Sequence, residues 1–413
     1  MTGGSSENNG AAPPPLQGVR VLDLSRVLAG PLAAMALGDL GAEVIKVENP
    51  NGGDDTRHWG PPFHEGVAGY FLAFNRNKRS ITIDLKNPEG AALIRELAAR
   101  SDILIENYRL GTLDDLGLGA EALMTLNPGL IFASVSGYGR TGPRAAEAGY
   151  DFVIQAESGL MSITGDRDGE PHKVGLPISD IVTGLTLSQT ILAALYARHR
   201  DGKGQHIDMA LLEAQQAVMG NIGTGALITG LEAARFGNAH PNIVPYQVFY
   251  AVDAPFVIAC GNDRQFGLLC ERVLERPDLS GDRRFASNTD RVANRDALEK
   301  IIADIVAAAP ADDWIARLRG CGIPAGKVRG VLEALATPEA EARGVVQAPD
   351  ADADSELNLI RSAHRLSRTP IDETFRPPPA LGADSQAVLT DVLELSPDRI
   401  AALQRSGALG SAN

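Results

Sequence analysis

Short apolar runs alternate with amphipathic stretches along the first half of the chain. Five runs rich in valine, isoleucine and leucine are typical of buried strands: residues 19–24, 42–47, 80–85, 103–107 and 130–135. The stretches 31–40 and 89–99 between them have the apolar spacing of helices. This alternation predicts a parallel sheet with helices on both faces. Such sheets bind ligands at the carboxyl ends of their strands, so functional loops are expected after Leu24, Val47, Leu85, Ile105 and Val135.

The pattern changes beyond about residue 240. Two strand-like runs and two short helical patterns follow, at residues 246–250, 256–260, 266–274 and 295–309. We therefore predict an α/β architecture with a large Rossmann-like parallel-sheet domain and a smaller α+β domain over residues 240–345. Between them, residues 203–209 are expected to form a strand and residues 210–228 a long helix. The pattern alone leaves open which domain the tail after Leu357 joins.

A long apolar helix is predicted over residues 181–198, and Asp180 stands at its start. Pro177 and Ser179 suit a helix start, whereas the basic residues 198–200 suit its end. A carboxylate here faces free backbone N–H groups and the positive end of the helix dipole, so its anion is expected to be favoured at neutral pH. Capping of the helix alone also explains an aspartate at this position. A chemical role for Asp180 therefore needs support from other parts of the chain.

Composition and charge argue against several classes of function. The 413 residues carry a net charge of −14, which disfavours a broad surface for nucleic acid or an anionic membrane. The three cysteines lack CxxC spacing and the seven histidines form no HxxxH pattern, so we expect neither a disulfide framework nor a metal site. Residues 1–15 lack an apolar signal core and are predicted to be a disordered tail. The helix over 181–198 is too polar for a clean membrane span, and a cytoplasmic location is expected.

Three loops carry candidate chemistry. Residues 137–142 match G-x-G-x-x-G, but the first β-α-β unit has a different loop, which disfavours a dinucleotide site. The loop over 52–63 contains Arg57 and Trp59 directly after a predicted strand, where binding loops and ordinary turns both occur. Residues 74–80 gather three cations, which indicates either a solvated charge run or a phosphate pocket.

Six separated motifs resemble the class III CoA-transferases, the CaiB/BaiF family, in the same order along the chain: residues 19–31, 40–48, 75–80, 106–108, 137–143 and 204–208. The resemblance runs from about Leu16 to Ala408. Three further segments look most similar to the succinate–hydroxymethylglutarate (glutarate) CoA-transferase branch: residues 53–63, 243–247 and 261–266. The resemblance implies an enzyme whose substrates are CoA thioesters and small carboxylic acids, with no permanently bound cofactor.

The resemblance implies that Asp180 is the nucleophile. Its carboxylate is expected to attack the acyl-CoA thioester, which gives a mixed anhydride and CoA thiolate, and these then form an aspartyl-CoA thioester that the acceptor resolves. The implied reaction moves CoA from a donor such as succinyl-CoA to a dicarboxylate acceptor. The α-methylacyl-CoA racemases of this family have a histidine where this chain has Tyr150, and tyrosine, with an unperturbed pKa of about 10, is a poor base at neutral pH. A racemase, a noncatalytic CoA-binding protein and, more distantly, an NAD-dependent dehydrogenase remain the alternatives.

The resemblance also implies contacts with CoA, and polar residues in loops near the expected site are candidates for contacts with the acceptor. The CoA-binding positions are Leu28, Ala29, Ile83, Lys86, Asn107, Tyr108 and Arg109. Asn49 and Asp115 replace arginines of the formyl-CoA transferase branch, so the phosphates need other cations. The candidates for that role are Lys78, Arg79, Lys86 and Arg109. The acceptor is expected to contact Arg26, Arg57, Tyr150 and Tyr246.

A homodimer of two interlocked, ring-like subunits is a further implication of the resemblance, with neither nucleic acid nor membrane as a partner. The large domain would then use both chain ends. The expected division is a tail at 1–15, the first part of the large domain at 16–205, a linker strand and helix at 206–239, the small domain at 240–345 and a return segment at 346–413.

Overall fold

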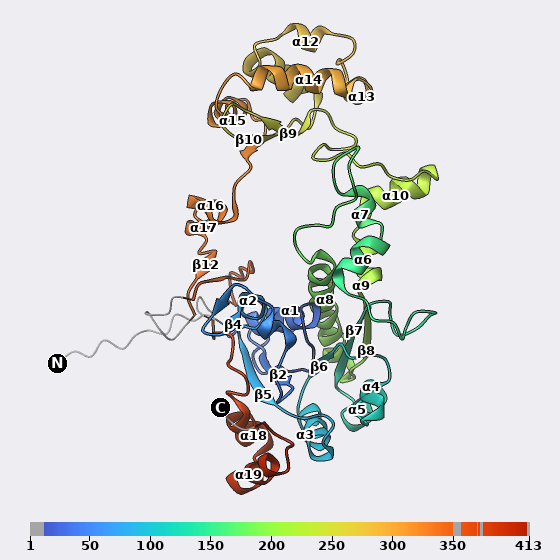
Figure 1. The fold of residues 1–413 in the computed structure, drawn as a ribbon, viewed down its shortest axis with the longest axis vertical. Coiled ribbons are helices and arrows are strands. Elements are labelled where there is room, and N and C mark those ends of the chain that lie inside the picture. Colours follow the sequence, from blue (N-terminus) through green and yellow to red (C-terminus); the bar gives the residue numbers. More distant parts are fainter. Residues whose placement is uncertain (1–11, 350–356, 370, 372–374, 411–413) are drawn as a thin grey trace, which may run out of the picture. The chain divides into compact units, whose positions relative to one another are not determined.

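The computed structural model describes residues 12–349, 357–369, 371 and 375–410, and it divides into two compact units (Figure 1). Unit 1 comprises Met1–Leu160, Val174–Ile228 and Ala340–Asn413, and unit 2 comprises Met161–Lys173 and Thr229–Glu339. Unit 2 is therefore inserted into a domain that takes up segments from both halves of the chain. Most of the predicted tail, residues 1–11, lies outside the described residues.

Six parallel strands form the centre of unit 1. They are β1 (Arg20–Asp23), β2 (Glu43–Glu48), β5 (Lys78–Thr82), β6 (Ile103–Glu106), β7 (Ile131–Ser136) and β8 (His206–Ala210). Their order in the sheet is β5-β2-β1-β6-β7-β8, and every pairing is parallel. Counted along the chain, this is the 3-2-1-4-5-6 order of Rossmann-like sheets, which reverses between β1 and β6. The predicted fold class is confirmed.

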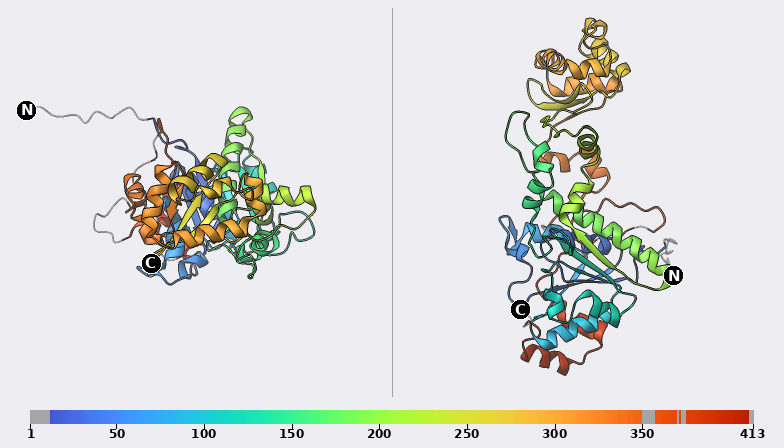
Figure 2. Two further views of the ribbon diagram at one scale, coloured as in Figure 1. Left: turned by 90° about the horizontal axis from the view of Figure 1, so that it is seen from above. Right: turned by 90° about the vertical axis from the view of Figure 1, so that its right-hand side faces the viewer.

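Helices cover both faces of this sheet (Figures 1 and 2). One face packs against α1 (Ala29–Asp39), α8 (Ile178–Asp201) and α9 (Leu211–Ala217). The other face packs against α3 (Pro88–Ala99), α5 (Ala120–Leu126), α18 (Ser385–Leu393) and α19 (Pro397–Arg405). Strands that are buried on both faces consist of nearly continuous aliphatic residues, and this is the pattern that predicted them.

The C-terminal segment covers the open edge of the sheet along β5. The Ser80 N–H donates to Oδ2 of Asp384 at 2.8 Å, and the Ser80 carbonyl accepts from the Asp384 N–H at 2.9 Å. The Thr82 N–H donates to Oγ of Ser385 at 3.3 Å. These bonds satisfy backbone groups that an edge strand would otherwise leave unpaired.

Residues 206–228 differ from the prediction. Strand β8 pairs with β7, so part of the segment predicted as a linker belongs to the central sheet of unit 1. The long helix expected over 210–228 is divided into α9 and α10 (Gly220–Thr229). Gly220 has a φ of +48°, in the left-handed region that glycine tolerates, and this conformation interrupts the helix.

Unit 2 is a small α+β body. Its antiparallel sheet has the order β11-β10-β9, with β9 (Tyr246–Tyr250), β10 (Pro255–Ala259) and β11 (Ala325–Lys327). Its longer helices are α11 (Asp263–Leu268), α14 (Arg295–Val306) and α15 (Ala311–Gly320). The core includes Phe256, Leu298 and Trp314. Residues 161–173 join this unit through an ion pair of Arg167 with Asp296 at 2.9 Å.

The remaining elements are short. Unit 1 also contains a 3₁₀ turn (Asp55–His58), β3 (Phe63–His64), β4 (Val67–Ala68), α2 (Gly69–Phe74), α4 (Thr112–Asp115), α6 (Asp151–Glu157), β12 (Val346–Gln347) and β13 (Leu359–Ile360). Unit 2 also contains a π-helical turn (Leu269–Val273), α12 (Asp278–Gly281), α13 (Asn288–Ala293) and α16 (Val331–Leu335). Two helices lie at the unit boundaries, α7 (Leu160–Ile163) and α17 (Pro338–Ala342).

Candidate active site

A pocket opens in unit 1 at the carboxyl ends of β1, β6 and β7, where the strand order reverses. The loops that follow these strands form most of its wall: residues 26–29, 107–110, 135–137 and 145–150. Asp55 and Trp59 from the loop after β2, Leu211 from α9 and Asp180 from α8 complete it. The predicted functional loops after Leu24, Val47, Ile105 and Val135 therefore meet in one place.

Asp180 is the third residue of α8, and its side chain is partly exposed in this pocket. Burial, and then the negative charge of Asp151, raise the pKa of Asp180 to about 7. The sequence predicted the opposite, because a helix start was expected to favour the anion. The carboxyl group instead titrates near neutral pH, where it is a more basic nucleophile than an ordinary aspartate.

Asp151, the second cause after burial of the raised pKa of Asp180, occupies the start of α8. It is the first residue of α6, and its Oδ1 accepts from the N–H of Ser179 at 2.8 Å and from the N–H of Asp180 at 3.3 Å. Its Oδ2 accepts from Nε2 of Gln155 at 2.7 Å. The carboxylate that caps α8 is therefore Asp151, and Asp180 extends from the capped turn.

Tyr70 on α2 interacts electrostatically with Asp180, although it is not among the residues that line the pocket, and the sequence reasoning missed it. Burial and the charges of Asp180, Asp151 and Asp54 raise the pKa of Tyr70 to about 12, so its hydroxyl keeps its proton at neutral pH. Its ring meets Trp59 edge-on, with a centroid distance of 5.5 Å. The segment 69–74 is a short apolar helix without any sequence motif, so in the sequence only its neighbour Trp59 stands out.

Seven of the predicted site residues line the pocket together with Asp180: Arg26, Leu28, Ala29, Asn107, Tyr108, Arg109 and Tyr150. Asn107 joins two of the loops, because its Oδ1 accepts from the Arg26 N–H at 2.9 Å and its Nδ2 donates to the Arg26 carbonyl at 2.7 Å. The guanidinium of Arg26 lies 5.8 Å from the centre of the Tyr108 ring and forms an exposed ion pair with Asp55 at 3.2 Å. Two cations, Arg26 and Arg109, thus border the pocket.

The loop after β1 is held in an unusual conformation by buried charges. Val27 has a φ of +72°, which is rare for a β-branched residue, and its N–H lies 3.3 Å from both carboxylate oxygens of Asp54. Nζ of Lys46 donates to Oδ2 of Asp54 at 2.9 Å and to the Ser25 carbonyl at 3.1 Å. Burial opposes ionisation of Asp54, but Lys46 and the hydrogen bonds of Thr56 keep its pKa below the ordinary value. This ion pair therefore fixes the loop that carries Arg26 and Leu28.

Two predicted roles do not fit the structure. Lys78 is fully buried, and its Nζ donates to Asp23, to Asn75 and to the Pro31 carbonyl at 2.9–3.0 Å, so it is not available to a phosphate. Arg57 is also buried. Its guanidinium donates to both carboxylate oxygens of Glu48 at 2.7 and 2.8 Å and stacks on the Phe71 ring, so it does not hold an acceptor carboxylate.

Three other predicted residues of unit 1 lie away from the pocket, and a fourth belongs to unit 2. Arg79 bridges Glu43 and Asp391 with distances of 2.8 and 3.0 Å, near the start of β5 and not at its carboxyl end. Ile83 belongs to the hydrophobic core, and Lys86 is exposed outside the pocket wall. Tyr246 lies in unit 2 on β9, with its ring 5.3 Å from that of His240. Its predicted contact with the acceptor stays a prediction.

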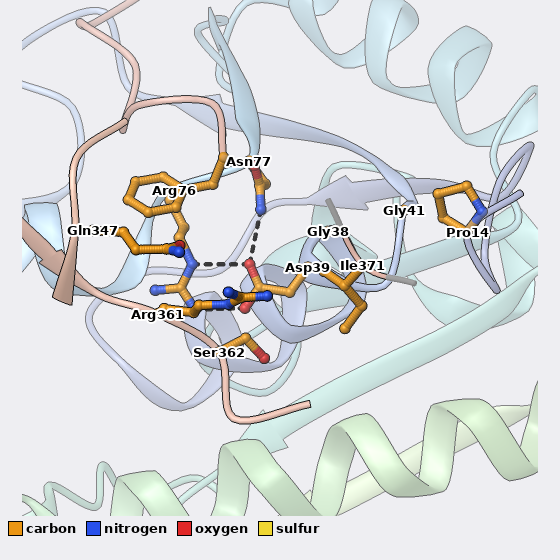
Figure 3. Close-up of a pocket in the computed structure, with 11 residues that line it drawn as sticks. Pro14, Gly38, Asp39, Gly41, Arg76, Asn77, Gln347, Arg361, Ser362 and Ile371 are labelled. Carbon is orange, nitrogen blue, oxygen red and sulfur yellow. Dashed lines mark hydrogen bonds and ion pairs between the residues drawn. The ribbon is translucent and has the colours of Figure 1, made fainter. Parts of the chain in front are cut away.

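A second pocket lies at the opposite end of α1 and does not share residues with the first (Figure 3). There, Nε and Nη2 of Arg76 donate to the two carboxylate oxygens of Asp39 at 2.9 and 2.5 Å. Nδ2 of Asn77 also donates to Asp39 at 2.8 Å. The charges of this group neutralise one another within the fold. Among the described residues, no group of three or more histidine, cysteine, aspartate or glutamate side chains is placed to hold a metal ion.

The pocket at the strand reversal combines one basic carboxyl group with two arginines, which suits acyl transfer to and from a carboxylate. Residues 16–385 match the model of CoA-transferase family III. The chain belongs to CoA-transferase family III. The resemblance found in the sequence motifs is therefore confirmed, and this family III protein is a CoA-transferase.

Curated relatives of this family III chain cover nearly its whole length. The succinate–glutarate CoA-transferase of Agrobacterium fabrum is 45% identical over 385 residues, which are 92% of this chain and 96% of the relative. The succinyl-CoA:glutarate CoA-transferase of Mus musculus is 42% identical over 395 residues, which are 96% of this chain and 90% of the relative. The crystal structure of a CaiB/BaiF family protein from Brucella suis superimposes with a TM-score of 0.83 at 45% identity, and covers 92% of this chain and 100% of that one.

Proposed function

We propose that this CoA-transferase moves CoA from succinyl-CoA to a dicarboxylate such as glutarate, with Asp180 as the covalent nucleophile. The single observation that carries the proposal is the position of Asp180, a basic carboxyl group at the start of α8 in the pocket where the strand order reverses. The named activities of the Agrobacterium fabrum and Mus musculus relatives support the donor and the acceptor class.

The proposed reaction consists of four acyl exchanges at one side chain. The Asp180 carboxylate attacks the thioester carbonyl, the C–S bond breaks, and CoA leaves as a thiolate from a mixed anhydride. The thiolate then attacks the Asp180 carbonyl carbon, which expels succinate and leaves an aspartyl-CoA thioester. The acceptor carboxylate attacks this thioester and releases the thiolate again. In the last step the thiolate attacks the acceptor carbonyl of the new anhydride, which gives acceptor-CoA and restores the Asp180 carboxylate.

Groups around Asp180 supply the binding contacts of this proposal. Arg26 and Arg109 line the pocket and are the proposed partners of the distal carboxylate of the acceptor and of a CoA phosphate. The protonated hydroxyl of Tyr70 is a hydrogen-bond donor for an acyl oxygen near Asp180. Tyr150, which is 65% exposed, forms part of the wall at the mouth of the pocket. A tyrosine at position 150 also disfavours the racemase alternative, since racemases of this family use a histidine there as the base.

We also propose a homodimer, in the cytoplasm, as the working form. Helix α8 has a mean hydropathy of 1.4 over an 18-residue window, of which only 33% is buried, so length and composition alone would let it cross a membrane. However, Leu187, Ile191 and Ala194 of α8 pack into the core of unit 1. Its outer face exposes Leu185 and Tyr196, and a second copy that covers this face would account for the apolar character of the whole helix.

The proposed function is tested by product masses. Purified protein is mixed with succinyl-CoA and a set of dicarboxylates, and new acyl-CoA masses are recorded for wild type, Asp180→Asn and Asp201→Asn. Asp201 is the matched control, since it is an exposed aspartate at the other end of α8. We expect a new thioester from wild type and Asp201→Asn but not from Asp180→Asn. Transfer by Asp180→Asn would exclude the covalent role, and binding of CoA without transfer to any acceptor would exclude the activity.

A further inference from the structure

Two carboxyl groups meet at the start of α8, and only one of them belongs to the helix. The other is Asp151 on α6, whose Oδ1 accepts from the N–H groups of Ser179 and Asp180 at 2.8 and 3.3 Å. Gln155 holds the other oxygen of Asp151 at 2.7 Å and accepts from the Val174 N–H through its own Oε1 at 2.9 Å. The Asp151 carboxylate is thus held in one orientation by bonds to three partners.

This arrangement removes the usual source of stabilisation for a carboxylate at a helix start. Free N–H groups and the helix dipole normally favour an anion there. Here the N–H of Asp180 itself is directed to Asp151, and a second negative charge stands beside the nucleophile. Burial and then the neighbouring charge of Asp151 raise the pKa of Asp180.

Few other charges face Asp180 from the elements that pack around α8. On β7 and β8, the residues against α8 are apolar, such as Val135 and Ile207. Helix α1 has its only charged side chain, Asp39, at its far end, and Glu213 on α9 is exposed. Tyr70 on α2 is protonated at neutral pH.

The charged groups of the pocket wall are Arg26, Asp55, Arg109 and Glu147. The first two neutralise each other in an ion pair at 3.2 Å. Among the charged groups of the described residues, Asp151 is the one that raises the pKa of Asp180, after burial.

We propose that Asp151 is a positioning residue that destabilises the resting anion of Asp180 relative to its uncharged acylated forms. The inference rests on the proposed covalent role of Asp180. An anhydride or thioester on Asp180 carries no charge at that oxygen, so the repulsion by Asp151 and the cost of burial act on the free carboxylate and not on the acylated side chain. Asp151 thereby favours acylation, while its bonds to the helix start fix the direction from which Asp180 attacks.

The test variants remove the charge of Asp151 and keep a side chain that can still accept hydrogen bonds from the start of α8. Asp151→Asn retains an oxygen that can accept from the two N–H groups, and Asp151→Ser places another preferred capping residue there if the asparagine variant folds poorly. Glu213→Gln is the matched control, since it removes one negative charge from α9, a helix packed against α8, outside the pocket wall. Rates are measured from pH 5 to pH 9 with succinyl-CoA and the acceptor.

Two readouts report on the proposal. We expect the acid midpoint of kcat/KM to move down by about one pH unit in Asp151→Asn and to stay in place in Glu213→Gln. We also expect the fraction of protein that carries a covalent adduct, measured by intact mass after an acid quench, to fall by about tenfold, because one pKa unit corresponds to a factor of ten. A purely structural role of Asp151 would lower the rate without moving the midpoint.

An unchanged midpoint in both folded, uncharged variants would overturn the inference and leave the proposed function intact. Failure of the proposed function has a different signature, since Asp180→Asn would then still form the adduct or transfer CoA. An adduct fraction that rises in Asp151→Asn would also overturn the inference, because it would mean that the charge of Asp151 opposes acylation.

Discussion

Replacement of Asp180 by asparagine is expected to stabilise the folded protein, and increasingly so as the pH rises from 4 to 8. The folded carboxyl group has a pKa of about 7, raised by burial and then by Asp151 from the ordinary 3.8. A carboxyl group whose pKa is raised on folding stabilises the fold only while it keeps its proton, so this contribution is complete below about pH 4 and lost as the pH passes 7. Above that pH the fold contains an unfavourable anion, and asparagine does not ionise.

The size of this stabilisation follows from the difference between the ordinary pKa of 3.8 and the pKa of about 7 in the fold. Each pKa unit corresponds to about 1.4 kcal/mol, so the advantage of Asp180→Asn should grow by about 4 kcal/mol in total, as an upper limit, between pH 4 and pH 8. At pH 5 the same reasoning gives only about 1.5 kcal/mol. The difference between pH values isolates ionisation, because the change in shape and hydrogen bonding from aspartate to asparagine is the same at each pH.

The assay is urea unfolding at pH 5, 6, 7 and 8 at one fixed protein concentration. The chain has two tryptophans, Trp59 in the pocket wall of unit 1 and Trp314 in the core of unit 2. A Trp314→Phe background lets Trp59 fluorescence report on unit 1 alone. The free energy of unfolding is compared between Asp180→Asn and its parent, with Asp201→Asn as the control for which we expect no trend with pH. A constant difference across this range would refute the argument, because Asp180 would then have an ordinary pKa.

Four further outcomes are expected. The kcat/KM of wild type should fall about tenfold per pH unit below pH 7, since the nucleophile must be ionised, and a profile flat down to pH 5 would contradict this. Lys78→Met should lower the free energy of unfolding by about 3–5 kcal/mol, because it leaves Asp23 buried without its ion-pair partner. The KM for acyl-CoA, measured on the folded protein, should stay constant. A raised KM would restore Lys78 as a phosphate contact. Arg26→Ala should raise the KM of the acceptor or of the acyl-CoA, and a KM unchanged for both in steady-state kinetics would remove Arg26 from the site. Tyr70→Phe keeps the ring against Trp59 and should lower kcat/KM about tenfold through loss of one hydrogen bond, whereas equal rates would show that the hydroxyl is not used.

The architecture of unit 1 could be predicted from the sequence because its strands are buried on both faces. Such strands consist of short aliphatic runs, and their alternation with helices leaves few topologies. The pocket loops followed from the same rule. Leu28, Asn107 and Tyr150, which were expected as contacts on the basis of the family resemblance, line the pocket with Asp180, and their contacts with substrate stay predictions. The break between α9 and α10 was not accessible, because a single glycine with a positive φ looks like any other glycine in an apolar stretch.

The electrostatics of the site could not be predicted, because they depend on partners that are distant in sequence. Lys78 looked like a surface cation, yet its partner Asp23 lies 55 residues earlier and both are buried. Asp180 looked like a stabilised anion, yet Asp151, 29 residues earlier on another helix, takes up its N–H. A sequence pattern gives the side chains that can carry charge, but only the assembled fold decides which charges are paired and which repel.

The hydrogen bonds between β5 and the C-terminal segment have a consequence for how the chain is synthesised. Ser80 and Asp384 are 304 residues apart in the chain, so β5 leaves the ribosome long before the C-terminal segment that pairs with it. During that interval all of unit 2 is made, and β5 presents an open edge of unpaired backbone groups that can pair with other nascent chains. Release of a chain that stops short of Asp384 would leave this edge permanently exposed, so premature termination before that residue should yield aggregates and not a slightly shortened enzyme.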